Sequence, residues 1–215
     1  MNAFDEFYNG LHNKKIVMLF KIPKFNELKY PVIFTYPQIE IIFKHTLNMK
    51  FKVIFGFMYL MGLKPNEVIF LKLENYNPKN KTIILFDKQG IESRTLHVPE
   101  PLTILIDIYR TRNKPKVYMF VGRDNKKYNE RTAERYFTNV LKGCNIIIEA
   151  SLETLRSSYI AHQLMCGMDK NTLKHLTGLK SLRSINAYLQ DNLDVDNIKI
   201  FTTGVDLLYH NEDRN

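Results

Sequence analysis

The residues between Glu153 and Tyr188 have types and an order that suit the transfer of a phosphoryl group. Glu153 precedes Arg156 by one helical turn, a Thr-Gly-Leu-Lys segment begins at Thr177, and Tyr188 follows. An arginine guanidinium can bind two oxygens of one phosphate, and a tyrosine hydroxyl can attack phosphorus as a nucleophile. The segment therefore predicts a site that acts on a phosphate ester.

The same segment resembles the catalytic box of the tyrosine recombinases, the phage integrase family. In that family a His-x-Leu-Arg motif, a Leu-Gly-His motif and a terminal tyrosine follow one another at the spacings found here. Arg156 and Tyr188 fall on the family's arginine and nucleophile. Glu153 and Leu179 stand where the family has histidine, or tryptophan at the second position. The resemblance therefore predicts the fold more directly than the activity.

Further segments extend the resemblance toward the N-terminus. Residues 61–68 are similar to the family's Thr-Gly-Leu-Arg box, with Glu67 on its glutamate and Lys64 in place of its first catalytic arginine. Lys88, in a predicted hairpin turn, falls on the family's catalytic lysine. The family's phenylalanine strand and the start of its next helix match residues 119–122 and 128–132.

The resemblance implies a reaction on duplex DNA that needs no metal and no cofactor. The tyrosine hydroxyl attacks a phosphodiester, forms a 3′-phosphotyrosyl bond and frees a 5′-hydroxyl, so the bond energy is conserved. Two arginines bind the non-bridging oxygens, the hairpin lysine protonates the leaving oxygen, and the first histidine helps to accept the tyrosine proton. Tyr188, Arg156, Lys88 and Lys64 are the catalytic residues implied here.

Three positions depart from the family's pattern, and each change weakens the implied chemistry. Lys64 keeps the positive charge but lacks the planar guanidinium that binds two oxygens at once. Leu179 removes a hydrogen-bond donor to the phosphate, and Glu153 places a carboxylate near the anion, which it repels. Loss of one preorganised donor costs about 3 kcal/mol, and such losses are not additive. We expect reduced or lost catalysis. Two alternatives would restore it: Glu153 as the proton acceptor for Tyr188, or a donor from His162, His175, Lys180 or Arg183.

A purely structural interpretation of these residues stays open. Arg156 would then pair with Glu153 as a local ion pair within one helix. Tyr188 would pack in a core or interface, as most helix tyrosines do. Lys88 would be an exposed turn lysine, and Lys64 a residue at a helix start.

Composition favours one domain with a polyanionic partner. The chain has 215 residues, is 45% hydrophobic and carries 31 Lys and Arg against 22 Asp and Glu, a net charge of +9, which suits DNA. Two cysteines form no disulfide framework and the start lacks an apolar signal core, so we expect a cytoplasmic or nucleoid-associated protein in a reducing compartment. No apolar run approaches the ~20 residues of a membrane helix, and the histidines show no paired spacing typical of a metal site.

The pattern of apolar residues predicts a mainly α fold with a small antiparallel β-sheet (α+β). Thr35 with Gln38 forms a capping box that opens a helix over about 36–48, and a second helix over 50–61 closes near Gly62. Pro65 begins another helix, whose apolar positions are Val68, Phe70, Leu71 and Leu73. The remaining elements are a hairpin of residues 81–87 and 93–98, a helix over 102–112, an apolar run at 117–121, a helix over 130–141, and helix from 142 to about 189.

Three regions follow from this reading of the chain. Residues 1–30 are a short lead, 31–189 resemble the recombinase catalytic domain, and 190–215 are a tail. The tail carries acidic residues and then an apolar run from Ile198 to Tyr209, which is unlike a solvated end. In the family a C-terminal segment packs on the neighbouring subunit, so we expect a homo-oligomer through the tail, with packing in cis as the alternative.

Two functional hypotheses remain. The first is a DNA-binding tyrosine recombinase or integrase that works through Tyr188, and the retained Arg156 and Lys88 favour it. The second is a non-catalytic DNA-binding or assembly protein with the same fold, for example a replication or transcription accessory factor. The replacements at Glu153 and Leu179 favour it.

Overall fold

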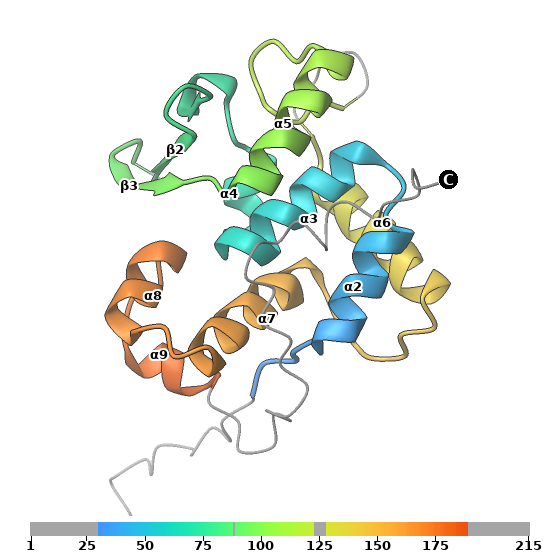
Figure 1. Cartoon of the computed structure of the whole chain (residues 1–215), viewed down its shortest axis with the longest axis vertical. Helices are drawn as coiled ribbons and strands as arrows, with labels where there is room; N and C mark the ends of the chain where they lie inside the picture. Colours follow the sequence, from blue (N-terminus) through green and yellow to red (C-terminus); the bar gives the residue numbers. More distant parts are fainter. Residues whose placement is uncertain (1–29, 88, 123–127, 189–215) are drawn as a thin grey trace, which may run out of the picture.

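The computed structural model describes residues 30–87, 89–122 and 128–188 (Figure 1). The predicted mainly helical fold with a small antiparallel sheet is confirmed. The elements in chain order are α2 (Tyr36–His45), α3 (Met49–Met61), α4 (Pro65–Ile69), the 3-10 turn η1 (Leu73–Asn75), β1 (Tyr76–Asn77), β2 (Thr82–Phe86), β3 (Glu92–His97), α5 (Glu100–Asn113), α6 (Glu130–Gly143), α7 (Leu152–Met165), α8 (Lys170–Thr177) and α9 (Arg183–Asn186).

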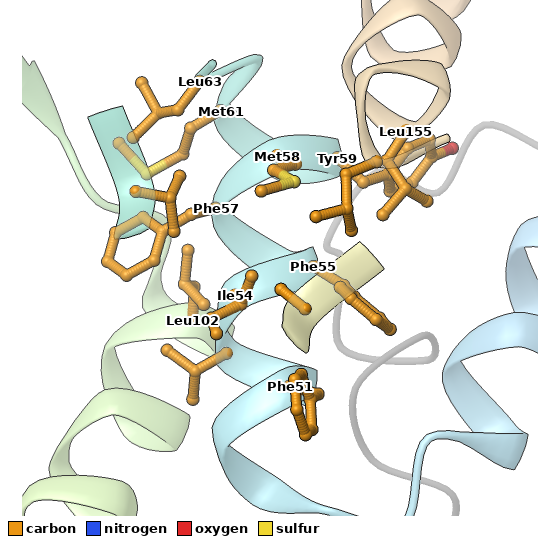
Figure 2. Packing of buried hydrophobic residues seen from close by; sticks show 14 of the residues in the cluster. Phe51, Ile54, Phe55, Phe57, Met58, Tyr59, Met61, Leu63, Leu102 and Leu155 are labelled. Atoms are coloured by element: carbon orange, nitrogen blue, oxygen red, sulfur yellow. The ribbon is translucent and has the colours of Figure 1, made fainter. Parts of the chain in front are cut away.

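Helix α3 lies at the centre of the molecule and is buried on nearly all sides. Apart from Lys50 and Lys52 near its start, its residues are apolar on all sides, which is typical of a helix enclosed by other elements. Figure 2 shows Leu102 of α5 and Leu155 of α7 on opposite sides of α3, and α5 and α7 make its most extensive helix contacts. Gly56 allows α5 to approach, because a Cβ there would lie 2.7 Å from Leu102 Cδ1. Helix α3 is therefore held between α5 and α7.

The predicted helix ends at α2 and α3 are present. Thr35 and Gln38 form the expected capping box at the start of α2. That helix ends at His45, earlier than expected, because Asn48 caps a new helix through a bond from Lys50 N–H to its side chain. Gly62 closes α3 in the left-handed conformation, with φ of 65°.

The predicted hairpin is the larger part of a three-stranded antiparallel sheet. The strand order is β1-β2-β3, and Ile83 of β2 lies opposite Leu96 of β3. Ile83, Leu85 and Leu96 point into the core, as the period of two requires. Arg94 has the same inward parity on β3 and is also buried. The sheet thus carries one arginine toward the interior.

The expectation of helical apolar positions after Pro65 is wrong beyond Ile69. Leu71 and Leu73 pair with the 117–121 run instead: Met119 N–H donates to Leu71 O at 2.7 Å, and Leu73 N–H to Val117 O at 2.9 Å. These backbone bonds cannot form from a helix, so α4 stops and η1 and β1 follow.

The expectation of helix from 142 to about 189 is correct only in part. Helices α7, α8 and α9 are separate, since Ser151 and Asp169 begin new helices and Gly178 ends α8 with φ of 66°. Residues 1–29 of the lead, Lys88 and the whole tail of residues 190–215 lie outside the described residues. Within the described ranges, no helix is long and apolar enough to cross a membrane.

Candidate functional site

Four segments of the fold meet where α8 ends. They are the turn between α3 and α4, the first turns of α7, the strand β3, and the backbone of Leu176, Thr177 and Gly178. Figure 1 shows α8 below the sheet, on the same side of the molecule as β3. Three backbone carbonyls in a row at the end of α8 accept hydrogen bonds from three different cationic side chains. A helix C-terminus attracts cations in this way, because its last carbonyls lack helical partners.

Arg156 is held at this point by two backbone carbonyls. Its Nε donates to Gly62 O at 2.9 Å and its Nη2 to Thr177 O at 3.1 Å. Arg156 is only 4% exposed. The guanidinium therefore ties α7 to the ends of both α3 and α8.

Glu153 binds the third nitrogen of the same guanidinium. Arg156 Nη1 donates to Glu153 Oε1 at 2.5 Å, a short charge-assisted bond. The structural interpretation predicted this pairing, and it is confirmed.

Leu152 N–H, beside Glu153, donates to the carboxylate of Glu134 on α6. Burial raises the pKa of Glu134, and the nearby charges of Glu130 and Glu153 raise it further.

Lys64 reaches the carbonyl next to the one that Arg156 binds. Its Nζ lies 3.5 Å from Gly178 O, a long hydrogen bond. Its backbone N–H donates to Glu67 Oε2 at 2.9 Å, which fixes the start of α4. The structure thus brings the predicted residues Arg156 and Lys64 together on one turn of backbone.

Arg94 is the third cationic side chain that binds the end of α8, and sequence reasoning missed it. Arg156, Lys64 and Arg94, with the carbonyls that they bind, are called the cluster below. Its Nη1 and Nη2 donate to the two oxygens of Glu67 at 3.0 and 2.9 Å, and its Nε donates to Leu176 O at 3.0 Å. The signal was present: Arg94 shares the parity of Leu96 and Val98 on β3, so the alternation placed it on the buried face. An inward arginine needs a buried partner.

Glycines at two positions allow neighbouring side chains to pack directly against the backbone. A Cβ on Gly178 would lie 2.7 Å from Arg94 Nη1, and one on Gly62 would lie 2.5 Å from Tyr159 Cδ1. Both residues also have positive φ, which disfavours other residue types. These glycines permit the close approach of backbone and guanidinium groups.

Leu179 lies on the wall of a shallow cavity of about 320 Å³ beside the cluster. Arg94 forms part of the cavity, and Lys174 and His175 from the last turn of α8 line it as well. Leu179 also packs against the hydrophobic core. The apolar side chain at this position therefore contributes packing and offers no donor to an anion.

Tyr188 and the hairpin turn complete the predicted set. Tyr188 follows α9, is partly buried against the core, and donates its N–H to Ile185 O at 3.0 Å. Lys88 lies outside the described residues. The turn on either side of it is ordered by Asp87, whose side chain accepts the N–H groups of Gln89 and Ile91, each at 2.9 Å.

His162 is excluded as a substitute phosphate donor. Its ring stacks on Tyr36 with centroids 4.0 Å apart, and its Nδ1 shares a hydrogen bond of 3.0 Å with Tyr59 Oη. Burial lowers the pKa of His162 to about 4, so the ring is neutral at physiological pH. His175, Lys180 and Arg183 remain exposed or at a cavity wall. Among the described residues, no cluster of His, Cys, Asp and Glu could hold a metal ion.

Comparison with known proteins identifies relatives of this chain. A model of the phage integrase family matches residues 33–194, which confirms the resemblance. Tyrosine recombinase XerA of Pyrococcus furiosus is 29% identical over 153 residues, covering 70% of this chain and 52% of that protein. Tyrosine recombinase XerC of Chlamydia pneumoniae is 24% identical over 182 residues, covering 79% and 56%. The chain spans little more than half the length of these relatives.

Solved structures share the fold. The crystal structure of XerA recombinase superposes with a TM-score of 0.68 at 18% identity, covering 75% of this chain and 61% of that one. A lambda integrase dimer bound to a COC′ core site has a TM-score of 0.63 at 14% identity, covering 80% and 64%. At these identities the likeness concerns the fold of the described residues.

Proposed function

This chain belongs to the phage integrase family, and we therefore propose that it binds duplex DNA and acts on one backbone phosphate. Arg156 and Lys64 bind the phosphate, Lys88 protonates the leaving oxygen, and Tyr188 is the nucleophile. The Tyr188 oxygen bonds to phosphorus as its hydroxyl proton passes to solvent, the bond to the 5′ oxygen breaks, and that oxygen takes a proton from Lys88. Rejoining reverses these steps without a cofactor.

One observation carries this proposal. Arg156 and Lys64, from segments far apart in the sequence, bind the consecutive carbonyls of Thr177 and Gly178. Two cations at one point form a preorganised site for the charge that builds on a phosphate. The net charge of +9 adds attraction for a polyanion.

We also propose that strand cleavage is slow. Lys64 offers a point charge where a guanidinium would bind two oxygens, and Leu179 offers no donor. Glu153 adds a negative charge beside Arg156. These features equally favour a second candidate function, that of a DNA-binding or assembly protein without catalysis.

A covalent adduct separates the two candidates. The chain is incubated with a library of nicked duplexes, whose cleavage product diffuses away and leaves any phosphotyrosyl bond trapped. The enzyme gives a protein–DNA adduct that resists denaturation and is lost in Tyr188→Phe. Duplex binding without an adduct, equal for both proteins across the whole library, favours the non-catalytic function.

Binding itself is tested by its salt dependence. We expect mostly sequence-tolerant binding, with a clearly negative slope of log affinity against log salt, because several phosphates exchange counterions for Lys and Arg. An absence of binding at low salt, or affinity that does not change with salt, contradicts DNA as the partner.

Self-association through the tail is a separate proposal. The apolar run from Ile198 to Tyr209 supports docking on a second copy of the chain, with packing in cis as the alternative. Light scattering compares the full chain with a chain ending at Asn192. An unchanged assembly state and unchanged solubility in the shorter chain contradict this role of the tail.

A further inference from the structure

The outward side of Arg156 is covered by a carboxylate of its own chain. Nε and Nη2 of Arg156 bind buried carbonyls, which leaves Nη1 as the third nitrogen, and Glu153 Oε1 binds it at 2.5 Å. The Arg156 side chain is 5% exposed, whereas that of Glu153 is 46% exposed. Glu153 therefore lies on the solvent side of the pair.

A phosphate that approaches Arg156 from solvent meets this carboxylate. Carboxylate and phosphate oxygens bind the same guanidinium donors, so the two groups compete for the Nη1 hydrogen that Glu153 accepts. A phosphate placed beside Glu153 without displacing it would add repulsion between like charges. Binding of a phosphate to Arg156 is therefore disfavoured while Glu153 is bound there, and binding of Glu153 is disfavoured while a phosphate is bound.

The Glu153 contact has the features of an exchangeable bond. Glu153 contributes one oxygen to a partner on its own helix and is half exposed. Within residues 30–87, 89–122 and 128–188, its second carboxylate oxygen accepts no hydrogen bond. Only the carboxylate of this pair is accessible to water, so water can solvate Glu153 when another anion takes its place on Arg156.

The backbone keeps the carboxylate close after displacement. Glu153 is the second residue of α7, whose N-cap is Ser151. The N-terminal turn of a helix stabilises negative charge, so Glu153 remains near Arg156 in either state. The competition is therefore intramolecular and always present.

We propose that Glu153 is an affinity-determining residue of this site, a built-in anion that competes with a phosphodiester for Nη1 of Arg156. The inference rests on the proposed function, since it concerns the phosphate of the same DNA. A phosphate that other contacts hold in place displaces Glu153. A free phosphate ion, which lacks those contacts, does not.

The first test compares DNA affinity in matched variants. Glu153→Gln removes the charge and keeps the shape. Asp107→Asn is the control, because Asp107 and Arg110 form another acid–arginine pair one turn apart on a helix, at 3.7 Å and on the surface. Fluorescence anisotropy with a labelled duplex of ~30 base pairs should show binding on the order of tenfold tighter for Glu153→Gln. Its salt slope should be steeper by about one, while Asp107→Asn stays near wild type.

The second test uses inorganic phosphate in place of DNA. The melting temperature of each protein is measured in sodium phosphate and in sodium chloride of equal ionic strength. A ligand that binds the folded state raises the melting temperature. We expect phosphate to stabilise Glu153→Gln and to leave wild type and Asp107→Asn unchanged.

The outcomes separate this inference from the proposed function. If Glu153→Gln matches Asp107→Asn in both assays, or binds DNA more weakly than wild type, Glu153 does not compete with phosphate and the inference is overturned. If no protein binds DNA while phosphate stabilises Glu153→Gln alone, Glu153 is confirmed as the competitor and the DNA function is overturned.

Discussion

Two arginine–glutamate pairs contribute to the same cluster, yet their surroundings differ. Arg94 binds both oxygens of Glu67, and the side chains are 4% and 13% exposed. Arg156 binds one oxygen of Glu153, and that carboxylate is 46% exposed. A buried bidentate pair that also holds backbone groups is a permanent part of the fold. A half-exposed single bond is one that a ligand can replace.

The comparison shows how one residue type serves two roles. Arg94 joins β3, α4 and α8 through Glu67 and Leu176 O. Arg156 uses Nε and Nη2 for the backbone, and its Nη1 binds the half-exposed carboxylate of Glu153. Under the proposed function, burial of the carboxylate partner, more than the distance of the bond, would decide which arginine can bind a phosphate.

The largest effect is expected from breaking the buried pair. Glu67→Gln leaves the Arg94 guanidinium buried without a counter-charge, so the free energy of unfolding should fall by about 3 to 5 kcal/mol. Urea denaturation measures it. The control Glu74→Gln, in an exposed pair with Lys72, should change little. A loss for Glu67→Gln as small as that control would remove the distinction between the two pairs.

A histidine on α7 adds a pH dependence that belongs to neither pair. Burial lowers the pKa of His162 to about 4 in the folded chain, against an ordinary value of 6.5. The unfolded chain therefore binds more protons between these values. Stability from His162 is full above pH 6.5 and is lost as the pH falls toward 4, by about 3 kcal/mol in total.

Unfolding measured from pH 7 to pH 4 checks this contribution. His162→Gln should flatten the decline, whereas His45→Gln, at an exposed position, should leave it unchanged. An equally steep decline in His162→Gln would show that other groups cause it.

A smaller effect is expected at the glycine that contacts Arg94. Gly178→Ala requires a left-handed conformation and puts a Cβ 2.7 Å from Arg94 Nη1, so we expect a loss of about 2 kcal/mol. Gly167→Ala has a similar φ with nothing within 4 Å, and should lose about 1 kcal/mol. Thermal unfolding of both variants isolates the packing against Arg94. Equal losses would mean that the guanidinium moves aside at no cost.

The smallest change in stability is expected for the exposed pair. Glu153→Gln should alter the free energy of unfolding by less than about 1 kcal/mol, because the carboxylate is half solvated. The same urea titrations as for Glu67→Gln give the value. A loss near that of Glu67→Gln would identify Glu153 as structural and would contradict its exchange with phosphate.

The sequence predicted the features that depend on hydrogen bonds between residues close together in the chain. Thr35 with Gln38 and the glycine after α3 set helix ends. The pairing of Glu153 with Arg156 lies within one helical turn. The motif order also predicted the family, which the match over residues 33–194 confirms.

Long-range contacts explain what the sequence did not predict. Leu71 and Leu73 fit the apolar spacing of a helix, but their backbone pairs with residues 117–119. Backbone pairing between distant segments produces no repeating pattern of residue types in the sequence. The partner of Arg94 is 27 positions away in the chain. The alternation could place Arg94 inward, but it could not identify Glu67.

A crystal structure of the chain bound to duplex DNA would show directly whether Glu153 gives way to a phosphate. We expect a backbone phosphate in contact with Arg156 Nη1, the Glu153 carboxylate turned away, and the bidentate Arg94–Glu67 pair unchanged. An Arg156–Glu153 bond that persists while the DNA phosphates lie elsewhere would contradict this expectation.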